Sequence, residues 1–224
     1  VGWNEGNMQS YYLVRTLFSR NRYHVVKSSV FDRRVDIVDM GTFLSTSNSL
    51  SPGEEYSFGT HLDVNQYYEG FLYSYHTNGV RNIGLRYKHL IPDEDWTAVE
   101  NGLLCHDIIE DARETLNDVK DALDEKSGEI VYALTNEKGR NRAGRANSKY
   151  YDEMKMIKHA EFAKLCDRIF NIESGIRTGS SMLKKYREEH DKFKEFLWTE
   201  KSIDLIEIWN DMESALFGKK ELTR

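Results

Sequence analysis

The sequence has little proline and little cysteine, and it contains no long uninterrupted run of apolar residues. The two prolines, Pro52 and Pro92, both look like boundaries between elements. Because a membrane-spanning helix needs about 20 mostly apolar residues, no such helix and no membrane partner are expected. The two cysteines, Cys105 and Cys166, lie among apolar residues and lack the CxxC spacing of a metal or redox site. We therefore expect two reduced core thiols and a cytoplasmic protein.

An excess of positive charge is also missing. The 224 residues include 31 Lys and Arg against 37 Asp and Glu, which gives a net charge of −6. Proteins that wrap nucleic acid are usually basic, so a duplex nucleic acid partner is not expected, although a small phosphorylated ligand needs only a local basic patch. The length fits one soluble domain with an elaboration, and the sequence leaves a homo-oligomer open.

The segment 24–60 differs from the rest of the chain. It begins with alternating β-branched residues and continues as a Ser- and Gly-rich stretch, which predicts a β-hairpin followed by a loop. The remainder has helical periodicity. We therefore predict a single, mostly α domain over residues 1–224, with 24–60 as an inserted hairpin and loop near the N-terminus and 62–217 as the helical core.

Helix start and stop signals divide the helical part. Asp93 is a candidate cap for a helix that carries the apolar residues before position 105. Thr115 and Asp118 form a capping-box pattern for the next helix. A long helix is expected to stop near Gly175, and Ser202 is a candidate cap for the last helix.

The stretch "LLCHDIIEDA" places one histidine and three carboxylates directly after apolar residues. On a helix His106 shares a face with Glu110, and Asp107 shares a face with Asp111. Carboxylates this close should raise one another's pKa, and a divalent cation would offset their repulsion. Nitrogen and oxygen ligands suit Mn²⁺, Fe²⁺ or Zn²⁺. The alternative is a solvated acidic helix end, but the apolar "GLLC" before it counts against that reading.

A second polar stripe lies downstream, in "FAKLCDRIFNIE". Lys164, Asp167 and Asn171 are spaced by three and four residues, so they share one face of the expected long helix. This pattern suits a ligand carboxylate that points into a pocket, and the alternative is an ordinary amphipathic surface. The candidates for a further histidine ligand are His61, His76, His89 and His159.

Taken together, these motifs resemble a known family. The resemblance covers about residues 70–175 and is to the RelA/SpoT-type branch of the HD-domain metal-dependent phosphohydrolases, which includes small stand-alone hydrolases similar to the metazoan SpoT homologue. The segments that carry it, in order, are "YSYHTNGV", "GLLCHDIIEDARETLNDV", "GEIVYALTNEKG" and "AKLCDRIFNIES". The resemblance implies the HD-domain helical bundle as the fold.

The resemblance also implies one metal centre. His106 and Asp107 match the HD dyad, His76 matches the first metal histidine, and Asp167 matches the last protein ligand. His61 is kept as the alternative to His76. The family implies one divalent cation, with Mn²⁺ as the first candidate and Fe²⁺ or Zn²⁺ as others.

Four further positions match residues that act beside the metal. The resemblance implies that Glu110 and Asp111 position and activate the attacking water. It places Asn171 near the bound nucleotide, and Lys164 falls where a lysine is common beside the last ligand.

A basic cluster lies between the two motif regions. Arginine forks match phosphate oxygens, so the cluster is a candidate phosphate-binding patch, and the alternative is a solvated loop. Tyr150 and Tyr151 either stack on a base or pack in the core. The basic residues are Lys138, Arg140, Arg142, Arg145 and Lys149.

These patterns predict a metal-dependent enzyme that cleaves a phosphate or pyrophosphate ester of a nucleotide, of the (p)ppGpp-hydrolase type. Family members carry a basic element shortly before the first histidine, where this chain has the acidic and aromatic "NQYYEGFLYSYH". That departure keeps a second hypothesis open, a nucleotidase acting on (deoxy)nucleotides or a dinucleotide cofactor. A third hypothesis is a non-catalytic binding or regulatory module with the HD fold.

Overall fold

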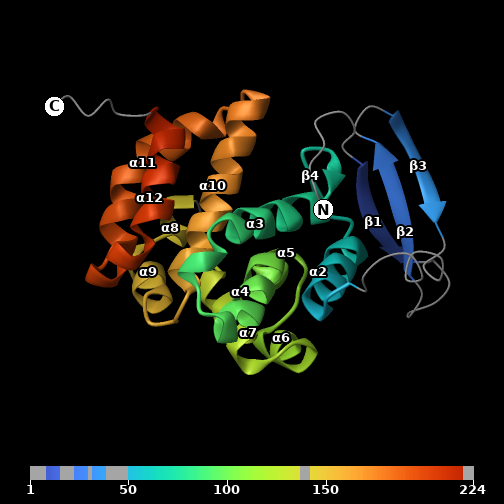
Figure 1. Ribbon diagram of the computed structural model, residues 1–224, viewed down its shortest axis with the longest axis horizontal. Coiled ribbons are helices and arrows are strands. Elements are labelled where there is room, and N and C mark those ends of the chain that lie inside the picture. The colour runs from blue at the N-terminus through green and yellow to red at the C-terminus, as the bar shows by residue number, and fades with distance from the viewer. Residues whose placement is uncertain (1–8, 16–22, 30–31, 39–49, 137–141, 219–224) are drawn as a thin grey trace.

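The computed structural model describes residues 9–15, 23–29, 32–38, 50–136 and 142–218, and it places a small β-sheet beside a bundle of helices (Figure 1). The sheet is antiparallel in the order β1-β2-β3, formed by Gln9–Arg15, Tyr23–Ser29 and Asp32–Val38. The predicted hairpin is thus confirmed as β2 and β3. The strand before residue 24 was missed, so the element is a three-stranded sheet.

The predicted loop is wrong over its last part, because α2 occupies Pro52–Asp63. A capping box starts this helix: the Ser51 Oγ accepts from the Glu54 N–H at 3.2 Å, and a Glu54 carboxylate oxygen accepts from the Ser51 N–H at 2.8 Å. Proline at the first helical position fits because its missing N–H would have no partner there. The helical part therefore begins before residue 62, and the expected loop over 39–49 lies outside the described residues.

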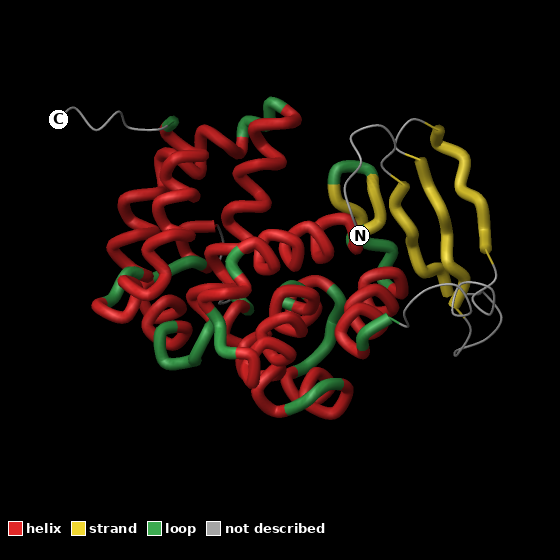
Figure 2. The backbone as a smooth tube through the Cα atoms, in the orientation of Figure 1, coloured by secondary structure: helices red, strands yellow, loops and turns green. Residues whose placement is uncertain are grey.

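Over residues 64–136 and 142–218 the described chain is mainly helical, with one short hairpin, as Figure 2 shows, and the fold is mostly α as predicted. Among the described residues, no helix is both long and apolar enough to span a membrane. The elements after α2 are β4 Tyr67–Tyr68, β5 Phe71–Leu72, α3 Ser74–Arg86, η1 Lys88–Leu90, α4 Asp93–Cys105, α5 Ile108–Asp111, α6 Leu116–Ala122, α7 Glu125–Leu134, α8 Arg142–Arg145, α9 Ser148–Met154, α10 Ala160–Thr178, α11 Met182–Leu197, η2 Glu200–Leu205 and α12 Ile206–Phe217.

The helix boundaries follow their local chemistry. The Thr115–Asp118 capping box is present at α6, as predicted. Asp93 is the first residue of α4 and not its cap. The α10 helix continues past Gly175 and ends at Gly179, whose φ of +67° is a left-handed conformation that favours glycine. Ser202 lies inside η2, where it completes the capping box of Thr199 and does not cap the last helix.

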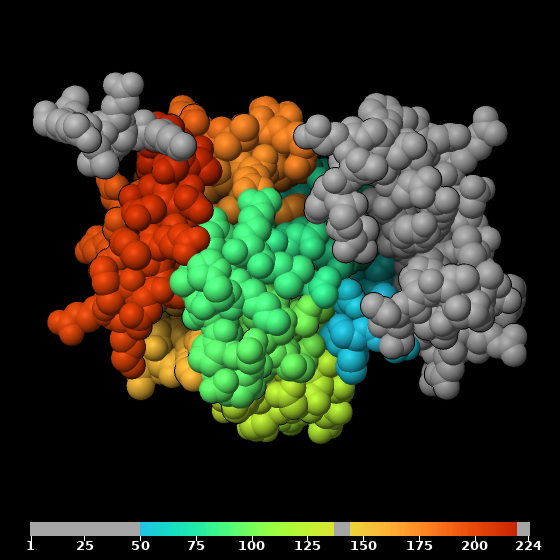
Figure 3. Space-filling view, in the orientation of Figure 1, coloured from blue at the N-terminus to red at the C-terminus, as the bar shows by residue number. Residues whose placement is uncertain are grey.

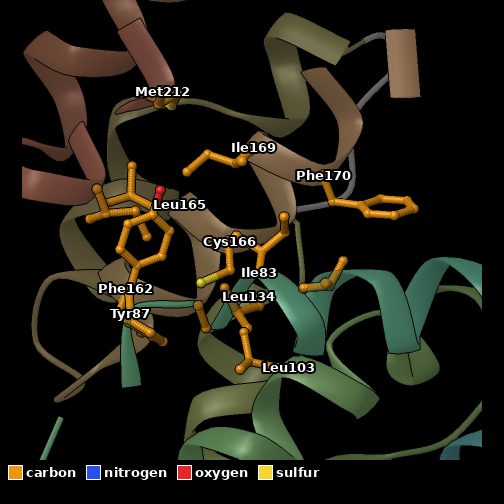
Figure 4. Packing of buried hydrophobic residues seen from close by; sticks show 14 of the residues in the cluster. Ile83, Tyr87, Leu103, Leu134, Phe162, Leu165, Cys166, Ile169, Phe170 and Met212 are labelled. Carbon is orange, nitrogen blue, oxygen red and sulfur yellow. The ribbon is translucent and has the colours of Figure 1, made fainter. Parts of the chain in front are cut away.

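Helix α10 lies at the centre of the core. It contacts α3, α4, α7, α11 and α12, and Figure 3 shows the middle helices in green between α2 and the C-terminal pair. Its Leu165, Cys166 and Ile169 belong to one buried cluster with Ile83 of α3 and Leu103 of α4, and Figure 4 shows Cys166 beside Ile83. Full burial of one such aliphatic side chain contributes about 1.5–3 kcal/mol. Because α10 also carries Asp167, the main core fixes one site residue directly.

Both cysteines are buried and free, as predicted for core thiols. Cys166 belongs to the main core around α10, and Cys105 belongs to a second cluster beneath α5. Burial raises the pKa of both thiols, so neither is activated for redox chemistry.

Helices α3 and α10 approach closely where Gly79 faces Phe170. A Cβ atom at position 79 would lie 2.0 Å from the Phe170 ring. We expect Gly79→Ala to lower the free energy of unfolding by about 1–3 kcal/mol, because overpacking outweighs the gain of about 1 kcal/mol in helix propensity. Urea unfolding would measure the change.

The matched control is Gly175→Ala on α10. There the new Cβ would lie 3.5 Å from Leu183, an ordinary contact, so this variant should be neutral or slightly more stable. Equal stability of Gly79→Ala and wild type would contradict the close approach of the two helices.

Asp95 ties the start of α4 to α7 and α10. Its carboxylate accepts from Lys158 Nζ at 2.6 Å, His159 Nε2 at 3.0 Å and Lys126 Nζ at 3.1 Å. These bonds, led by the one from Lys158, hold the pKa of Asp95 well below its usual value. The carboxylate form therefore stabilises the fold above the unfolded pKa of about 4, and this stability is lost as pH falls.

Asp95→Asn should weaken the acid dependence of folding. We expect the free energy of unfolding of wild type to fall between about pH 5 and about pH 2 more steeply than that of the variant. Urea titrations at several pH values would compare them. The control is Asp93→Asn, whose exposed side chain lies 3.9 Å from Lys88. If the unfolding free energy of Asp95→Asn fell with pH as steeply as that of wild type, this assignment would be contradicted.

Candidate metal centre

Four predicted ligands meet where α3, α4 and α10 come together. His76 lies in the first turn of α3, His106 directly follows α4, Asp107 comes next, and Asp167 lies on α10. The sequence predicted one continuous helix through 106–111, and this is wrong: α4 ends at Cys105, a turn holds His106 and Asp107, and α5 begins at Ile108. The turn brings both side chains of the dyad toward one point.

The ligand atoms of His76, His106 and Asp167 all lie within 4.8 Å of one another, and Asp107 adds an oxygen close to both histidines. His106 Nε2 is 3.0 Å from both His76 Nε2 and Asp107 Oδ2, and 3.8 Å from Asp167 Oδ1. His76 Nε2 is 3.4 Å from Asp107 Oδ2 and 3.6 Å from Asp167 Oδ1. Two atoms bound to one cation at about 2.1 Å lie about 3.0 Å apart at a right angle and about 3.4 Å apart at the tetrahedral angle.

The tautomer of His106 fits metal binding. His106 Nδ1 lies 3.0 Å from the Leu103 carbonyl oxygen, so Nδ1 carries the proton and Nε2 directs its lone pair into the cluster. Both histidines are buried, with 2% of His76 and 4% of His106 exposed. Two imidazole nitrogens and two carboxylate oxygens are a donor set for Mn²⁺, Fe²⁺ or Zn²⁺. The residues present therefore fit one divalent cation.

The electrostatics of the cluster favour positive charge. Burial alone would lower the pKa of His106, but Asp107 and Asp167 outweigh it and raise this pKa to about 9. Burial alone would raise the pKa values of both aspartates, yet the two histidines, with Lys164 beside Asp167, lower them. The same field that would retain a proton on an imidazole favours a divalent cation among these four groups.

Asp167 is oriented by its own helix. Asn171 Nδ2 donates to Asp167 Oδ1 at 2.5 Å, and Lys164 Nζ lies 3.3 Å from Asp167 Oδ2. Burial alone would lower the pKa of Lys164, but nearby Tyr150 and Asp167 raise it overall, so the ammonium stays charged. The predicted stripe on α10 is therefore joined to the metal cluster. The hydrogen bonds of Asn171 and Lys164 are to Asp167 itself, and their predicted contacts with a nucleotide stay a prediction.

Two tyrosines that the sequence analysis missed complete the cluster. The Tyr73 hydroxyl donates to Asp107 Oδ2, and the Tyr68 ring stacks on His76 with centroids 4.6 Å apart and an interplanar angle of 16°. Tyr68 also donates to Asn171 Oδ1 at 2.9 Å. The signal for Tyr73 was its place three residues before His76, one helical turn away, whereas Tyr68 reaches the site only because of the β4–β5 hairpin.

Glu110 and Asp111 lie beside the cluster, and each is held by a different hydrogen-bond partner. Glu110 Oε1 accepts from the Asn136 backbone N–H at 2.5 Å and from its side-chain Nδ2 at 2.8 Å. Asp111 Oδ2 accepts from Gln66 Nε2 at 2.7 Å. Both residues are exposed to solvent, yet partial desolvation of their carboxyls, together with the charge of Asp107, raises both pKa values. The pKa values of both carboxyls are thus shifted toward neutral pH, and a proton acceptor whose pKa lies near the working pH is most effective in catalysis.

The other candidate histidines lie apart from the cluster. His61, the alternative to His76, pairs with Gln66 at 2.6 Å and is not among the converging ligands. His89 is exposed and lies 2.8 Å from Glu207, and His159 bonds to Asp95. The geometry therefore favours His76 as the first histidine ligand.

The basic patch is only partly described. Arg145 and Lys149 are exposed, with Lys149 3.5 Å from Glu153. Tyr150 is buried and donates its hydroxyl to the Leu134 carbonyl at 2.8 Å, so that hydroxyl has a structural partner. Lys164 Nζ lies 6.0 Å from the Tyr150 ring centre, which places α9 at the border of the site. The side chain of Arg142, together with Lys138 and Arg140, lies outside the described residues.

Comparisons with known proteins show a likeness of fold. No protein-family model matches the sequence, and no curated protein matches it. A solved structure of a metazoan ortholog of SpoT, described as hydrolysing ppGpp and playing a role in starvation responses, is similar with a TM-score of 0.53 and 19% identity. The match covers 74% of this chain and 98% of that chain. The chain therefore shares the fold of that hydrolase, which confirms the predicted helical bundle.

Removing one ligand should remove the metal. We expect wild-type protein that is loaded with Mn²⁺ and desalted to retain about one ion per chain, and His106→Ala and Asp167→Asn to retain far less, because an incomplete donor set leaves a buried charge unpaired. Elemental analysis by plasma mass spectrometry would measure the content.

The control is His89→Ala, which removes an exposed imidazole outside the cluster and should leave the metal content unchanged. Excess Mn²⁺ should also raise the melting temperature of wild type and not that of His106→Ala. Full metal retention in both ligand variants would contradict the site.

Proposed function

We propose that the protein is a divalent-metal-dependent phosphohydrolase that cleaves a phosphate or pyrophosphate ester of a nucleotide. The observation that carries the proposal is the convergence of His76, His106 and Asp167, whose ligand atoms lie 3.0–3.8 Å apart, with Asp107 Oδ2 within 3.4 Å of both histidines and two further carboxyls beside the cluster. A bound cation would supply an activated water and would polarise a phosphoryl oxygen.

The residues of the chain supply the remaining tasks. Asn136 holds Glu110 by two hydrogen bonds to Oε1, and we assign the other carboxylate oxygen, Oε2, to proton transfer. Gln66 holds Asp111 in the same way through Oδ2. We assign proton removal from the attacking water to this pair jointly, because both carboxyls lie beside the cluster and their raised pKa values make each a better proton acceptor near neutral pH.

A non-catalytic module is the less favoured alternative. A binding protein needs neither a four-ligand cation cluster nor two further carboxyls with raised pKa values at its edge. In this chain the dyad and Asp167 come from different helices, and Tyr73 and Asn171 orient two of the ligands. Such a supporting arrangement around a ligand set is typical of a working metal site.

Two substrate classes remain as proposals. An alarmone of the (p)ppGpp type is first, supported by the shared fold with the metazoan SpoT ortholog and by the exposed Arg145 and Lys149. A nucleotidase acting on (deoxy)nucleotides or a dinucleotide is favoured by a different observation: the β4–β5 hairpin beside His76 presents the exposed aromatic residues Tyr67 and Phe71, suited to stacking on a base, in place of basic residues.

Glu110→Gln should separate metal binding from turnover. The amide is a much weaker base than the carboxylate, so we expect the variant to keep its metal and to lose at least about 100-fold in kcat. Phosphate release and elemental analysis on the same preparation would measure both. The control is Glu114→Gln, whose carboxylate accepts from Tyr56 at 2.7 Å. A Glu110→Gln enzyme with the wild-type rate would contradict the assigned role.

A product screen with Mn²⁺ would test the reaction itself. We expect phosphate or pyrophosphate release from at least one member of a panel that holds ppGpp, nucleoside and deoxynucleoside mono- and triphosphates, and a dinucleotide. Chromatography of the products would identify the bond that is broken, and His106→Ala would control for contaminating phosphatases. If metal-loaded protein bound one of these compounds without cleaving any, the non-catalytic alternative would replace this proposal.

A further inference from the structure

Gln66 lies between His61 of α2 and Asp111 of α5. Its Oε1 is 2.6 Å from His61 Nδ1, and its Nε2 is 2.7 Å from Asp111 Oδ2. The amide thus joins a buried imidazole, 2% exposed, to one of the two carboxyls beside the metal cluster. The described structure contains no other hydrogen bond to the Asp111 carboxylate.

The chemistry of these groups fixes the direction of each bond. The ionised carboxylate of Asp111 only accepts hydrogen bonds, so the NH₂ side of the Gln66 amide must face it. The carbonyl oxygen of the amide then faces His61, and Nδ1 of the imidazole must carry the proton. In a neutral imidazole the other nitrogen, Nε2, then carries a lone pair that can accept a hydrogen bond. Burial lowers the pKa of His61 to about 4, which agrees with a neutral ring.

That donor is missing among the protein groups around His61. His61 Nε2 and Ser74 Oγ are both buried and have no hydrogen-bond partner. Both residues line the same small cavity between α2 and α3, which offers about 10 Å³ to the centre of a water molecule. A volume of this size holds one water, and buried polar groups without protein partners are the usual reason for one to be ordered.

We propose that one water molecule binds between His61 Nε2 and Ser74 Oγ, and that Ser74, this water, His61 and Gln66 form a hydrogen-bond relay that holds Asp111. His61 and Gln66 are then positioning residues. The water donates to His61 Nε2, and the Ser74 hydroxyl donates to the water. Only the catalytic consequence of the relay rests on the proposed function, since the water and the proton position on His61 are properties of the folded protein.

The relay also reaches the metal ligands through Tyr73. The ring of His61 packs against that of Tyr73 with centroids 4.3 Å apart, and the Tyr73 hydroxyl donates to Asp107. His61 therefore supports Asp111 through the hydrogen bonds of Gln66. It supports Asp107 by packing against Tyr73. With Oδ2 of Asp111 held by Gln66, the other carboxylate oxygen is left to face the reacting groups.

Nitrogen-15 NMR of the zinc-loaded protein tests the relay without any assay of activity, because Zn²⁺ is not paramagnetic. We expect His61 to be the Nδ1–H tautomer in wild type, and to shift toward Nε2–H in Gln66→Met, where Nδ1 loses its acceptor. A crystal structure should show an ordered water within hydrogen-bond distance of His61 Nε2 and Ser74 Oγ. An Nε2–H tautomer in wild type, or a dry cavity, would overturn the proposal.

Kinetics tests the positioning role. Gln66→Met and His61→Phe should each lower kcat about 10-fold with KM and metal content little changed, and the double variant should lose no more than either alone, because both break one chain. The control is Thr60→Val, since the Thr60 hydroxyl bonds only to carbonyls within α2. Unchanged kcat, or losses that multiply, would overturn the role. An inactive wild type with the expected tautomer would instead count against the proposed function alone.

Discussion

The structure depends on holding two buried histidines and two partly buried aspartates close together. Each histidine nitrogen lies 3.0–3.8 Å from an oxygen of both aspartates, and the charge of Asp107 acts on Asp167, so the two carboxylates repel each other unless positive charge lies among them. The packing of α3, α4 and α10 supplies the force that keeps the four groups together. The free energy of hydrophobic burial therefore offsets the electrostatic repulsion among the groups of the site.

Helix α10 links that packing to the chemistry. One side of it carries Leu165, Cys166 and Ile169 into the core, and Asp167 lies between them in sequence but on the face that meets the histidines. Asn171, one turn later, orients Asp167 and receives a hydrogen bond from Tyr68. A displacement of this helix would therefore alter the core, a ligand and the hairpin at the same time.

Much of this could be predicted from the sequence, because helical periodicity and i,i+4 spacing are local properties. They identified the stripe of Lys164, Asp167 and Asn171, and the family resemblance identified His76. The break after Cys105 was not predictable, since "LLCHDIIEDA" continues the helical pattern through the turn. The role of Gln66 was hidden as well, because its partners lie five residues before it and 45 residues after it, and only the folded chain brings them together.

The β4–β5 hairpin differs from the helices in how it is attached. It is only a two-strand ribbon, Tyr67–Tyr68 with Phe71–Leu72, and it rests on the site through the ring and hydroxyl of Tyr68. The metal ligands, in contrast, are fixed by helices that Gly79 and Phe170 lock together. Under the proposed function, substitutions at the exposed ribbon residues Tyr67 and Phe71 would alter the contacts with a nucleobase, while Tyr68 and the helices continue to hold the cation ligands. Selectivity and reactivity would then be free to evolve separately.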